Sequence, residues 1–364
     1  MMCSCPYLGS RQPFFSPPRE PPPSLPLALV YLGNRQTDAP MMTPPKDLAQ
    51  AEPETLHEMI GQEHARQQLV TAIRSAVADN RMLDSPILLL GPGGCGKTQS
   101  ARCVATMVGA TDFRTILGSS IRSPAELSAL FLEQKRGSVL FLDEAVLPDP
   151  VQLALYLALD SRKIFLPAVG RSAPIALDIE PFVLILATTH AFCLNDSMRQ
   201  RCRIVVNFRH YTPEELQEIA RRRLSALNWS VDDDVLREAS HRGRGTPRLV
   251  LRLLNAGMRV TRSEGENTIT WKHFRQACFL GGTDRQGCDL VEQQYLGILH
   301  EHGASRLGMI ASRMGLPRRT IEQVVEGEWL IRGGFIEKDD QSKRFLTEKG
   351  REHASLLQAG LGYD

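Results

Sequence analysis

The chain has 364 residues, of which 42% are hydrophobic and 23% charged, as is ordinary for a globular protein of two or three domains. A net charge of +2 at pH 7 excludes a global field that would by itself attract nucleic acid. No stretch reaches 18 apolar residues, so no transmembrane helix and no membrane partner are expected. The eight cysteines are scattered and lack C-x-x-C pairs, which predicts neither a zinc site nor disulfides but reduced thiols in a cytoplasmic protein.

Residues 1–45 are rich in proline and are predicted to form a disordered tail, because proline breaks helices and lacks a backbone donor. The apolar patch at 25–32 has no positive segment directly before it and no small-residue cleavage pattern, so a signal peptide is not expected. Met41 and Met42 directly precede the ordered pattern, which favours the hypothesis that translation begins there. Peptides from residues 1–40 in the natural protein, found by mass spectrometry, would contradict it.

The block 46–210 is predicted to be a parallel α/β sheet, because short apolar strands alternate with helices. The strand 86–90 runs directly into G-x-x-x-x-G-K-T, the P-loop pattern, whose glycines let backbone N–H groups surround phosphate oxygens. The lysine can reach the β- and γ-phosphates, and the threonine hydroxyl can bind Mg²⁺. The residues predicted to bind the nucleotide here are Gly91, Gly94, Gly96, Lys97, Thr98 and Gln99.

The apolar strand 138–142 ends in two carboxylates, Asp143 and Glu144, downstream of the P-loop. This is the Walker B arrangement, in which the first carboxylate holds Mg²⁺ together with Thr98. The second carboxylate, Glu144, can polarise the water that attacks the γ-phosphate. The pattern therefore predicts ATP hydrolysis and not nucleotide binding alone.

Thr188 and Thr189 end the strand 182–187, and either hydroxyl could sense the γ-phosphate, although threonine also ends strands simply to satisfy turns. Arginines follow at 199, 201 and 203, and a guanidinium pairs well with phosphoryl oxygens. We predict that Arg201 acts as a finger on the nucleotide of a neighbouring subunit, which requires a ring. At least one of the three is expected to be a solvated rim residue.

Residues 211–283 show the periodicity of four helices and are predicted to form a small all-helical lid domain. Thr246 is a suitable N-cap and Pro247 fits the first turn of the helix that follows. Arg248 would then lie at the positive end of a helix, where a cation is disfavoured unless an anion is close. A nucleotide phosphate would supply that anion, so Arg248 is predicted to bind the nucleotide.

Residues 284–364 are predicted to form a winged helix, because a helix, a short turn and a second helix precede a hairpin. Residues 289–364 hold 10 Lys and Arg against 12 Asp and Glu, so a protein-binding module remains an alternative to DNA binding. In a ring, weak contacts from several subunits could add up on one duplex. The residues predicted to contact DNA are Arg318, Arg319, Lys338, Lys343 and Arg344.

The order and spacing of these motifs resemble the RuvB family, the AAA+ ATPases that drive Holliday-junction branch migration. The resemblance runs from about residue 53 to about residue 357. Departures at Glu52, Gln99 and His190 indicate a divergent member. The stretches that carry the resemblance are Leu56-x-x-x-Ile60-Gly61-Gln62, the P-loop, Leu140–Glu144, Ala187–Thr189, Met198–Arg201, Arg244–Leu249 and Gly334–Ile336.

The resemblance implies ATP and Mg²⁺ as cofactors, a homo-hexamer as the assembly, and double-stranded DNA at Holliday junctions as the substrate in recombination and repair. It implies that the inserted hairpin 161–180 contacts a RuvA-like junction-binding protein. The alternatives are another AAA+ DNA remodeller, of the clamp-loader or helicase-loader type, or a nucleotide-gated scaffold with little turnover. Glu144 and Arg201 argue against the scaffold, which needs neither.

The resemblance also assigns roles to single residues. Thr189, or Thr188 in its place, corresponds to sensor 1, and Arg248 corresponds to sensor 2. The position of an aromatic residue near the nucleotide falls on His210 or Tyr211. On the wing, Lys338 and Arg344 match the family's DNA-contacting arginines.

Overall fold

The computed structural model describes residues 47–48, 51–83, 85–166 and 175–362. The predicted tail, the hypothetical start at Met41 or Met42 and the apex of the predicted hairpin lie outside these ranges. None of the helices within the described ranges is long and apolar enough to cross a bilayer.

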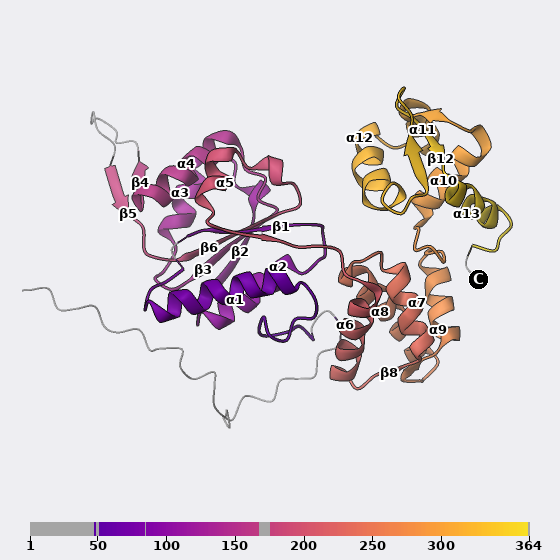
Figure 1. Cartoon of the computed structure of the whole chain (residues 1–364), viewed down its shortest axis with the longest axis horizontal. Helices are drawn as coiled ribbons and strands as arrows, with labels where there is room; N and C mark the ends of the chain where they lie inside the picture. The colour runs from indigo at the N-terminus through magenta and orange to yellow at the C-terminus, as the bar shows by residue number, and fades with distance from the viewer. Residues whose placement is uncertain (1–46, 49–50, 84, 167–174, 363–364) are drawn as a thin grey trace, which may run out of the picture. The chain divides into compact units, whose positions relative to one another are not determined.

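A parallel sheet forms the core of the first block, as predicted (Figure 1). Its central strands are almost wholly apolar because helices cover both faces of the sheet. The strands run in the order β2-β3-β6-β1-β7, with bounds β2 (Phe113–Leu117), β3 (Val139–Asp143), β6 (Val183–Thr188), β1 (Ile87–Leu90) and β7 (Ile204–Asn207).

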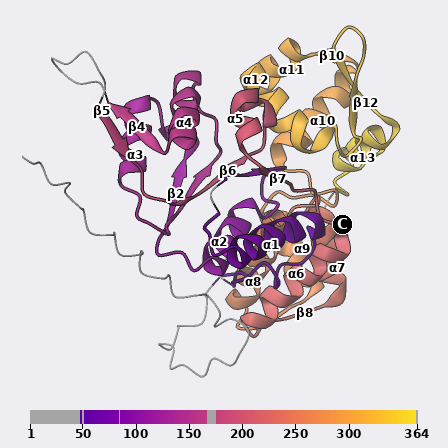
Figure 2. The same ribbon diagram turned by 60° about the vertical axis from the view of Figure 1, so that its left-hand side comes forward.

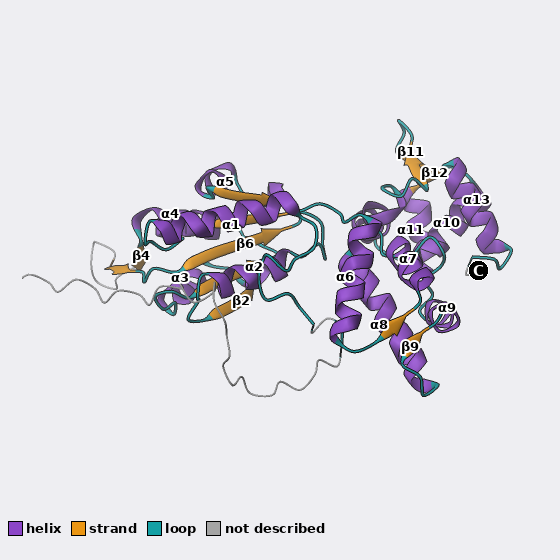
Figure 3. Cartoon of the chain, turned by 60° about the horizontal axis from the view of Figure 1, so that its bottom comes forward, coloured by secondary structure: helices purple, strands orange, loops and turns teal. Residues whose placement is uncertain are grey.

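Helices pack on both faces of this sheet; Figure 3 draws the helices in purple and the strands in orange. One face packs against α1 (Glu63–Ala78) and α2 (Lys97–Met107), which lie side by side in Figures 1 and 2. The other face packs against α3 (Pro124–Leu132), α4 (Asp149–Ser161) and α5 (Asp196–Arg201). Alternate residues of each strand enter the two cores, so the loops that follow the strands are held at one edge of the sheet.

The arms of the predicted hairpin, β4 (Lys163–Leu166) and β5 (Ile175–Asp178), form an antiparallel pair. Phe165 and Ile175 on these arms are 49% and 43% exposed. The pair therefore presents apolar side chains to solvent.

The lid contains the four expected helices. A Thr212–Glu215 capping box and Pro213 begin the first of them. The helices are α6 (Pro213–Ala226), α7 (Asp233–Arg242), α8 (Pro247–Ser263) and α9 (Trp271–Leu280), and a two-stranded parallel pair that was not predicted joins β8 (Ser230–Val231) to β9 (Thr268–Ile269).

The last block is a winged helix, and its core gathers Tyr295 and Phe335. The helix predicted after the short turn is present, but most of it is a π-helix, η4 (Ile321–Leu330), that continues from α12. The other elements are α10 (Leu290–His302), α11 (Leu307–Met314), α12 (Arg318–Thr320), a sheet in the order β10 (Ser305–Arg306), β12 (Lys343–Leu346), β11 (Ile336–Lys338), and α13 (Glu348–Gln358).

Candidate nucleotide site and DNA-binding surface

The P-loop joins the end of β1 to the start of α2, and its backbone requires glycine. Gly91, Gly94 and Gly96 have φ values of +144°, +72° and +96°. A Cβ on Gly91 would lie 2.5 Å from the carbonyl oxygen of Phe208, and one on Gly94 would lie 2.7 Å from Thr246 Cγ2. Any larger residue would thus be strained in its own backbone and would push neighbouring chain away from the loop.

Lys97 begins α2 and is only 8% exposed. Its Nζ donates hydrogen bonds to the carbonyl oxygens of Gly91 and Pro92, at 2.7 and 2.8 Å. Burial lowers the pKa of this ammonium group, which an anion beside it would counteract. The lysine is therefore folded back over the loop, within reach of the space that the loop encloses.

Thr98 and Asp143 come together across the P-loop and the end of β3. Thr98 Oγ1 donates to Asp143 Oδ2 at 3.1 Å, while Asp143 Oδ1 accepts from the backbone N–H of Glu144 at 3.0 Å. A hydroxyl beside a carboxylate is the hard oxygen donor set that Mg²⁺ prefers. These two residues fit the metal role predicted for them.

Glu144 is held in an unusual backbone conformation, with a φ of +46°. For a residue with a side chain this left-handed conformation costs on the order of 1 kcal/mol. The N–H of Ala145 donates to Ala187 O on β6 at 2.8 Å, which fixes the turn after β3. The strain points to a functional constraint on the direction of the Glu144 carboxylate.

A cavity of about 430 Å³ lies over the P-loop, and most predicted catalytic and phosphate-binding residues line it. The lid closes one side through the start of α8. The predicted residues on the cavity wall are Gly94, Gly96, Lys97, Thr98, Gln99, Asp143, Glu144, Thr189 and Arg248, with the alternative Thr188.

A second, largely apolar cavity of about 280 Å³ shares wall residues with the first, among them Glu52, Gln99 and Arg223. Polar and apolar chambers side by side suit the phosphates and the base of a nucleotide. The apolar wall was mostly missed from the sequence; its members include Pro53, Met59, Ile60, Tyr211, Ile219 and Leu251.

Gln99 links these two chambers to the start of the domain. Its Nε2 donates to the carbonyl oxygen of Pro53 at 2.7 Å. Glu52, the neighbour of Pro53 and a departure from the family pattern, lines both chambers. A carboxylate thus lies beside the space expected for the base.

Tyr211, and not His210, lines the apolar chamber. The Tyr211 hydroxyl would lie 3.3 Å from a Cβ built on Gly96, so the ring reaches the P-loop. His210 packs against Gly245, its buried Nδ1 has no hydrogen-bond partner, and burial lowers its pKa, with Arg332 acting in the same direction. Of the two residues left open by the sequence, the structure favours Tyr211 as the one near a nucleotide.

The two threonines at the end of β6 both line the cavity, but they differ in exposure and in hydrogen bonding. Thr188 is 1% exposed, and its hydroxyl bonds the backbone of His190. Thr189 is exposed, and its Oγ1 lies 2.7 Å from His190 Nδ1. Thr189 is thus freer to reorient toward a phosphate.

Arg248 lies against the P-loop, since a Cβ on Gly94 would come within 3.0 Å of Arg248 Cβ. Thr246 occupies the N-cap position of α8 as expected, but its side chain makes no capping hydrogen bond. Pro247 and Arg248 at this helix start both line the cavity over the P-loop, and the positive end of a helix beside a guanidinium is a favourable arrangement for an anion.

Arg201 lies outside the described walls of both nucleotide chambers, on α5. Its guanidinium is paired with Asp160, at 3.1 Å between Nη2 and Oδ2, and stacks 3.6 Å above the ring of Tyr156. Arg199 on the same helix has a 38% exposed side chain and pairs with Asp196. Neither arginine lines the cavity over the P-loop of its own chain.

The cations predicted to bind DNA fall into two groups. Arg318 and Arg319 are exposed at the start of α12, and Lys343 is partly exposed on the wing. Arg344, in contrast, has a 4% exposed side chain and donates to Glu326 at 2.9 Å. A direct contact between Arg344 and DNA, as predicted, does not fit this structure, because alternate residues of β12 face opposite sides and this one faces the core.

Arg344 points into the core because it pairs with the buried carboxylate of Glu326, on η4. Glu326 is 0% exposed and accepts hydrogen bonds from Tyr295, Arg344 and Lys338. Burial alone would raise the pKa of Glu326, but these hydrogen bonds outweigh it and hold the pKa below its ordinary value. Lys338 is therefore also engaged by the fold, although its side chain is 38% exposed.

Three family profiles match the chain: "Holliday junction DNA helicase RuvB P-loop domain" at residues 51–208, "RuvB AAA lid domain" at 211–280 and "RuvB C-terminal winged helix domain" at 285–355. Two similar curated proteins are the Holliday junction branch migration complex subunits RuvB of Kosmotoga olearia and Limosilactobacillus reuteri. The first is 32% identical over 86% of this chain and 94% of its own length; the second is 34% identical over 84% and 90%.

Solved structures agree with these matches. The RuvB Holliday junction branch migration motor of Thermotoga maritima is 28% identical, with a TM-score of 0.72, and the alignment covers 84% of this chain and 98% of that one. A mutant of the same Thermotoga maritima protein gives the same values. The chain belongs to the RuvB family of AAA+ ATPases.

Proposed function

We propose that this protein is an ATP-driven motor of the RuvB type, which hydrolyses ATP in a hexameric ring and moves duplex DNA through Holliday junctions. The observation that carries the proposal is the single cavity lined by Lys97, Thr98, Asp143, Glu144 and the lid residue Arg248. The names of the related branch migration subunits support the DNA substrate.

In the hydrolysis step, the P-loop N–H groups and Lys97 bind the phosphates. Thr98 and Asp143 would hold Mg²⁺, which neutralises charge on the β- and γ-phosphates when bound. Glu144 orients and polarises the attacking water, and Thr189 reports whether the γ-phosphate is present. Arg248 contributes a charge from the lid, so the lid can respond to the state of the nucleotide.

Arg201 completes the site only from a neighbouring subunit, since its own helix lies away from the nucleotide chambers of the described chain. To act there, it must leave Asp160 and Tyr156. Arg199, two residues earlier and more exposed, is the second candidate for the same role.

The winged helix contributes the contacts to DNA. Of the five cations predicted to contact DNA, Arg318, Arg319 and Lys343 are those that remain available at its surface. Cationic contacts to phosphates position a protein on a duplex without reading its sequence, as a motor that moves along any sequence requires.

A RuvA-like partner is proposed to bind the hairpin arms β4 and β5. Phe165 and Ile175 there are exposed, as are Leu153 and Leu157 on α4. An exposed apolar surface of this kind is typical of a protein-binding site. The apex of the hairpin lies outside the described residues.

Steady-state ATP hydrolysis, measured with no DNA, with linear duplex and with a four-way junction, tests the proposal. We expect turnover that junction DNA stimulates, and branch migration that a RuvA-like protein stimulates further. The matched control is Glu144→Gln, which should bind ATP and fail to hydrolyse it. ATP binding without DNA-stimulated turnover would favour the scaffold, and turnover without branch migration would favour another AAA+ remodeller.

A further inference from the structure

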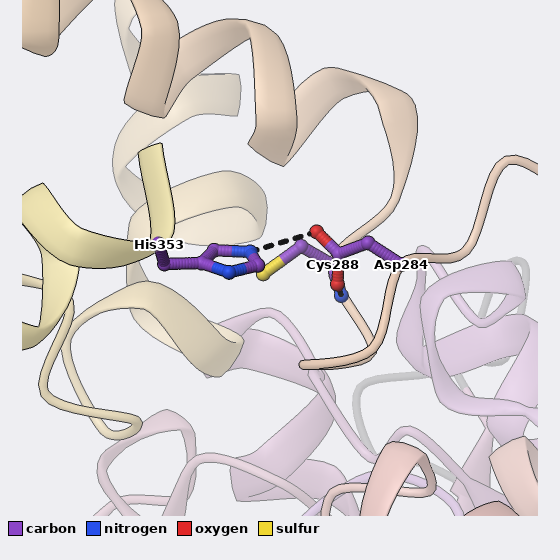
Figure 4. Close-up of side chains that lie close together, drawn as sticks. All are labelled: Asp284, Cys288 and His353. Atoms are coloured by element: carbon purple, nitrogen blue, oxygen red, sulfur yellow. Dashed lines mark hydrogen bonds and ion pairs between the residues drawn. The ribbon is translucent and has the colours of Figure 1, made fainter. Parts of the chain in front are cut away.

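Three buried side chains near the start of the winged helix bring a carboxylate, a thiol and an imidazole together (Figure 4). Asp284 and Cys288 lie between α9 and α10, and His353 lies on α13. Asp284 and Cys288 are 0% exposed, and His353 is 3% exposed. One potential ligand atom from each residue lies within 4.8 Å of the other two.

Hydrogen bonds close a turn in the segment that carries two of the three groups. Asp284 Oδ1 accepts the backbone N–H groups of Gln286 and Cys288, at 2.9 and 2.8 Å. The main chain closes the same turn, because Asp284 N donates to Cys288 O and Gly287 N donates to Asp284 O. These bonds use one carboxylate oxygen and leave the other, Oδ2, directed at His353 Nε2 at a distance of 2.9 Å.

The surroundings of the thiol are those of a ligand. A cysteine buried only for packing behaves as a small hydrophobe among apolar groups. Here the sulfur of Cys288 faces a carboxylate oxygen and an imidazole nitrogen that are themselves withdrawn from water. Hydrogen bonds already stabilise the buried Asp284 carboxylate, and a divalent cation would add the charge that a buried carboxylate and a thiolate together require.

The donor set selects the class of cation. One thiolate, one imidazole and one carboxylate suit Zn²⁺ or a similar borderline-soft divalent ion, and not Mg²⁺ or Ca²⁺. Donors of a tetrahedral Zn²⁺ site lie about 3.5 Å from one another. Asp284 Oδ2 and His353 Nε2 reach this spacing if the 2.9 Å bond between them opens slightly, and the Cys288 sulfur, within 4.8 Å of both, moves toward the cation.

We propose that Asp284, Cys288 and His353 bind one divalent cation of the Zn²⁺ class, with water as the fourth ligand. The cation replaces the proton between Asp284 and His353 and the proton on the Cys288 sulfur. It cross-links the segment before α10 to α13, two parts of the chain 69 positions apart. The turn 284–288 also contacts the lid, because Arg244 donates a hydrogen bond to the carbonyl oxygen of Gly287.

The test uses the full chain without nucleotide or Mg²⁺. Metal content is measured after purification without chelator, and the stripped protein is titrated with Zn²⁺ and with Co²⁺. We expect one equivalent of bound metal, a sulfur-to-cobalt charge-transfer band and a higher melting temperature with Zn²⁺. Cys288→Ala should lose the band and the shift, while the matched control Cys278→Ala, another buried cysteine, should keep both.

Two further variants test the site independently, in case Cys288→Ala does not fold. Asp284→Asn keeps an oxygen for the backbone bonds, and His353→Gln keeps a polar group on α13; both should weaken metal binding at least about tenfold. A stripped wild-type protein that gives no charge-transfer band with Co²⁺ would overturn the proposal. Metal binding of equal strength in all three variants would overturn it as well.

Discussion

Lys97 shows how one buried charge defines the phosphate site. Its ammonium group donates to two loop carbonyls in a space that glycines keep open. We expect these bonds to be exchanged for phosphate oxygens when a nucleotide binds, since the lysine is already held over the loop.

Replacing Lys97 with alanine should weaken ATP binding by at least about tenfold, since a hydrogen bond to a charged group contributes about 1.5–3 kcal/mol. Titration with a fluorescent ATP analogue measures the change. The exposed Lys135→Ala variant is the control and should bind like the wild type. Unchanged affinity in Lys97→Ala would contradict the assignment.

The neighbours His210 and Tyr211 make a second test at the same scale. Tyr211→Leu should weaken ATP binding roughly three- to tenfold, because an aromatic contact contributes about 0.5–1.5 kcal/mol beyond its buried area. His210→Asn should change affinity less than about twofold, since His210 is absent from the described cavity walls. Calorimetric titration of both variants decides, and a larger loss in His210→Asn would reverse the preference.

At the scale of elements, the wing shows that the fold itself can bind a cation that the sequence assigns to DNA contact. η4, β11 and β12 meet around Glu326, and Lys338 and Arg344 neutralise it there. Arg344 therefore contributes to stability, and the exposed start of α12 carries the surface charge.

Arg344→Met should destabilise the winged helix by about 3 kcal/mol, because it removes the main partner of a buried carboxylate. Hydrogen exchange of the amides in β11 and β12 reports this locally. The double variant Arg318→Ala, Arg319→Ala should leave that exchange unchanged. Its DNA affinity should fall and the salt slope should decrease by about 2, one per lost phosphate contact.

The same cluster predicts a dependence on pH. The folded pKa of Glu326 lies below the ordinary value of 4.5, so its ionised form stabilises the fold fully above that pH. This stability is lost as pH falls through the folded pKa. Melting curves of the wild type and Glu326→Gln should therefore converge toward acid pH, and a gap that widens on acidification would contradict the charge state.

At the scale of the whole molecule, the proposed hydrolysis requires parts that one chain does not bring together. The described cavity joins the core and the start of α8, while α5 faces elsewhere. An assembly in which α5 meets the cavity of the next subunit would couple hydrolysis around a ring.

Arg201→Ala should reduce turnover by about 10³-fold and leave ATP affinity within about twofold, the signature of an arginine finger supplied in trans. Mixing it with Lys97→Ala subunits should restore part of the activity. Some nucleotide sites that keep Lys97 then lie next to a neighbouring subunit that keeps Arg201. Arg199→Ala, measured alongside, distinguishes the two candidates. No rescue in any mixture, with either arginine, would contradict a site shared between subunits.

Motifs that lie on one continuous stretch could be predicted from the sequence. The P-loop, Asp143 with Glu144, and Thr188 with Thr189 each follow a buried strand directly, and parallel strands bring their ends to one edge. The family fold and the position of Arg248 at a helix start could be predicted for the same reason. Local order along the chain determines such features.

Features formed by side chains from distant segments could be recognised only in the tertiary structure. The sequence could not decide between His210 and Tyr211, nor show that Arg344 turns toward Glu326, because packing sets side-chain direction. It also predicted no zinc site, since Asp284 and Cys288 meet His353 only through the fold of α13. The sequence by itself determined the nucleotide chemistry and the family, because backbone geometry is local. The tertiary structure decided which charges stay in water, because burial depends on residues far apart in the chain.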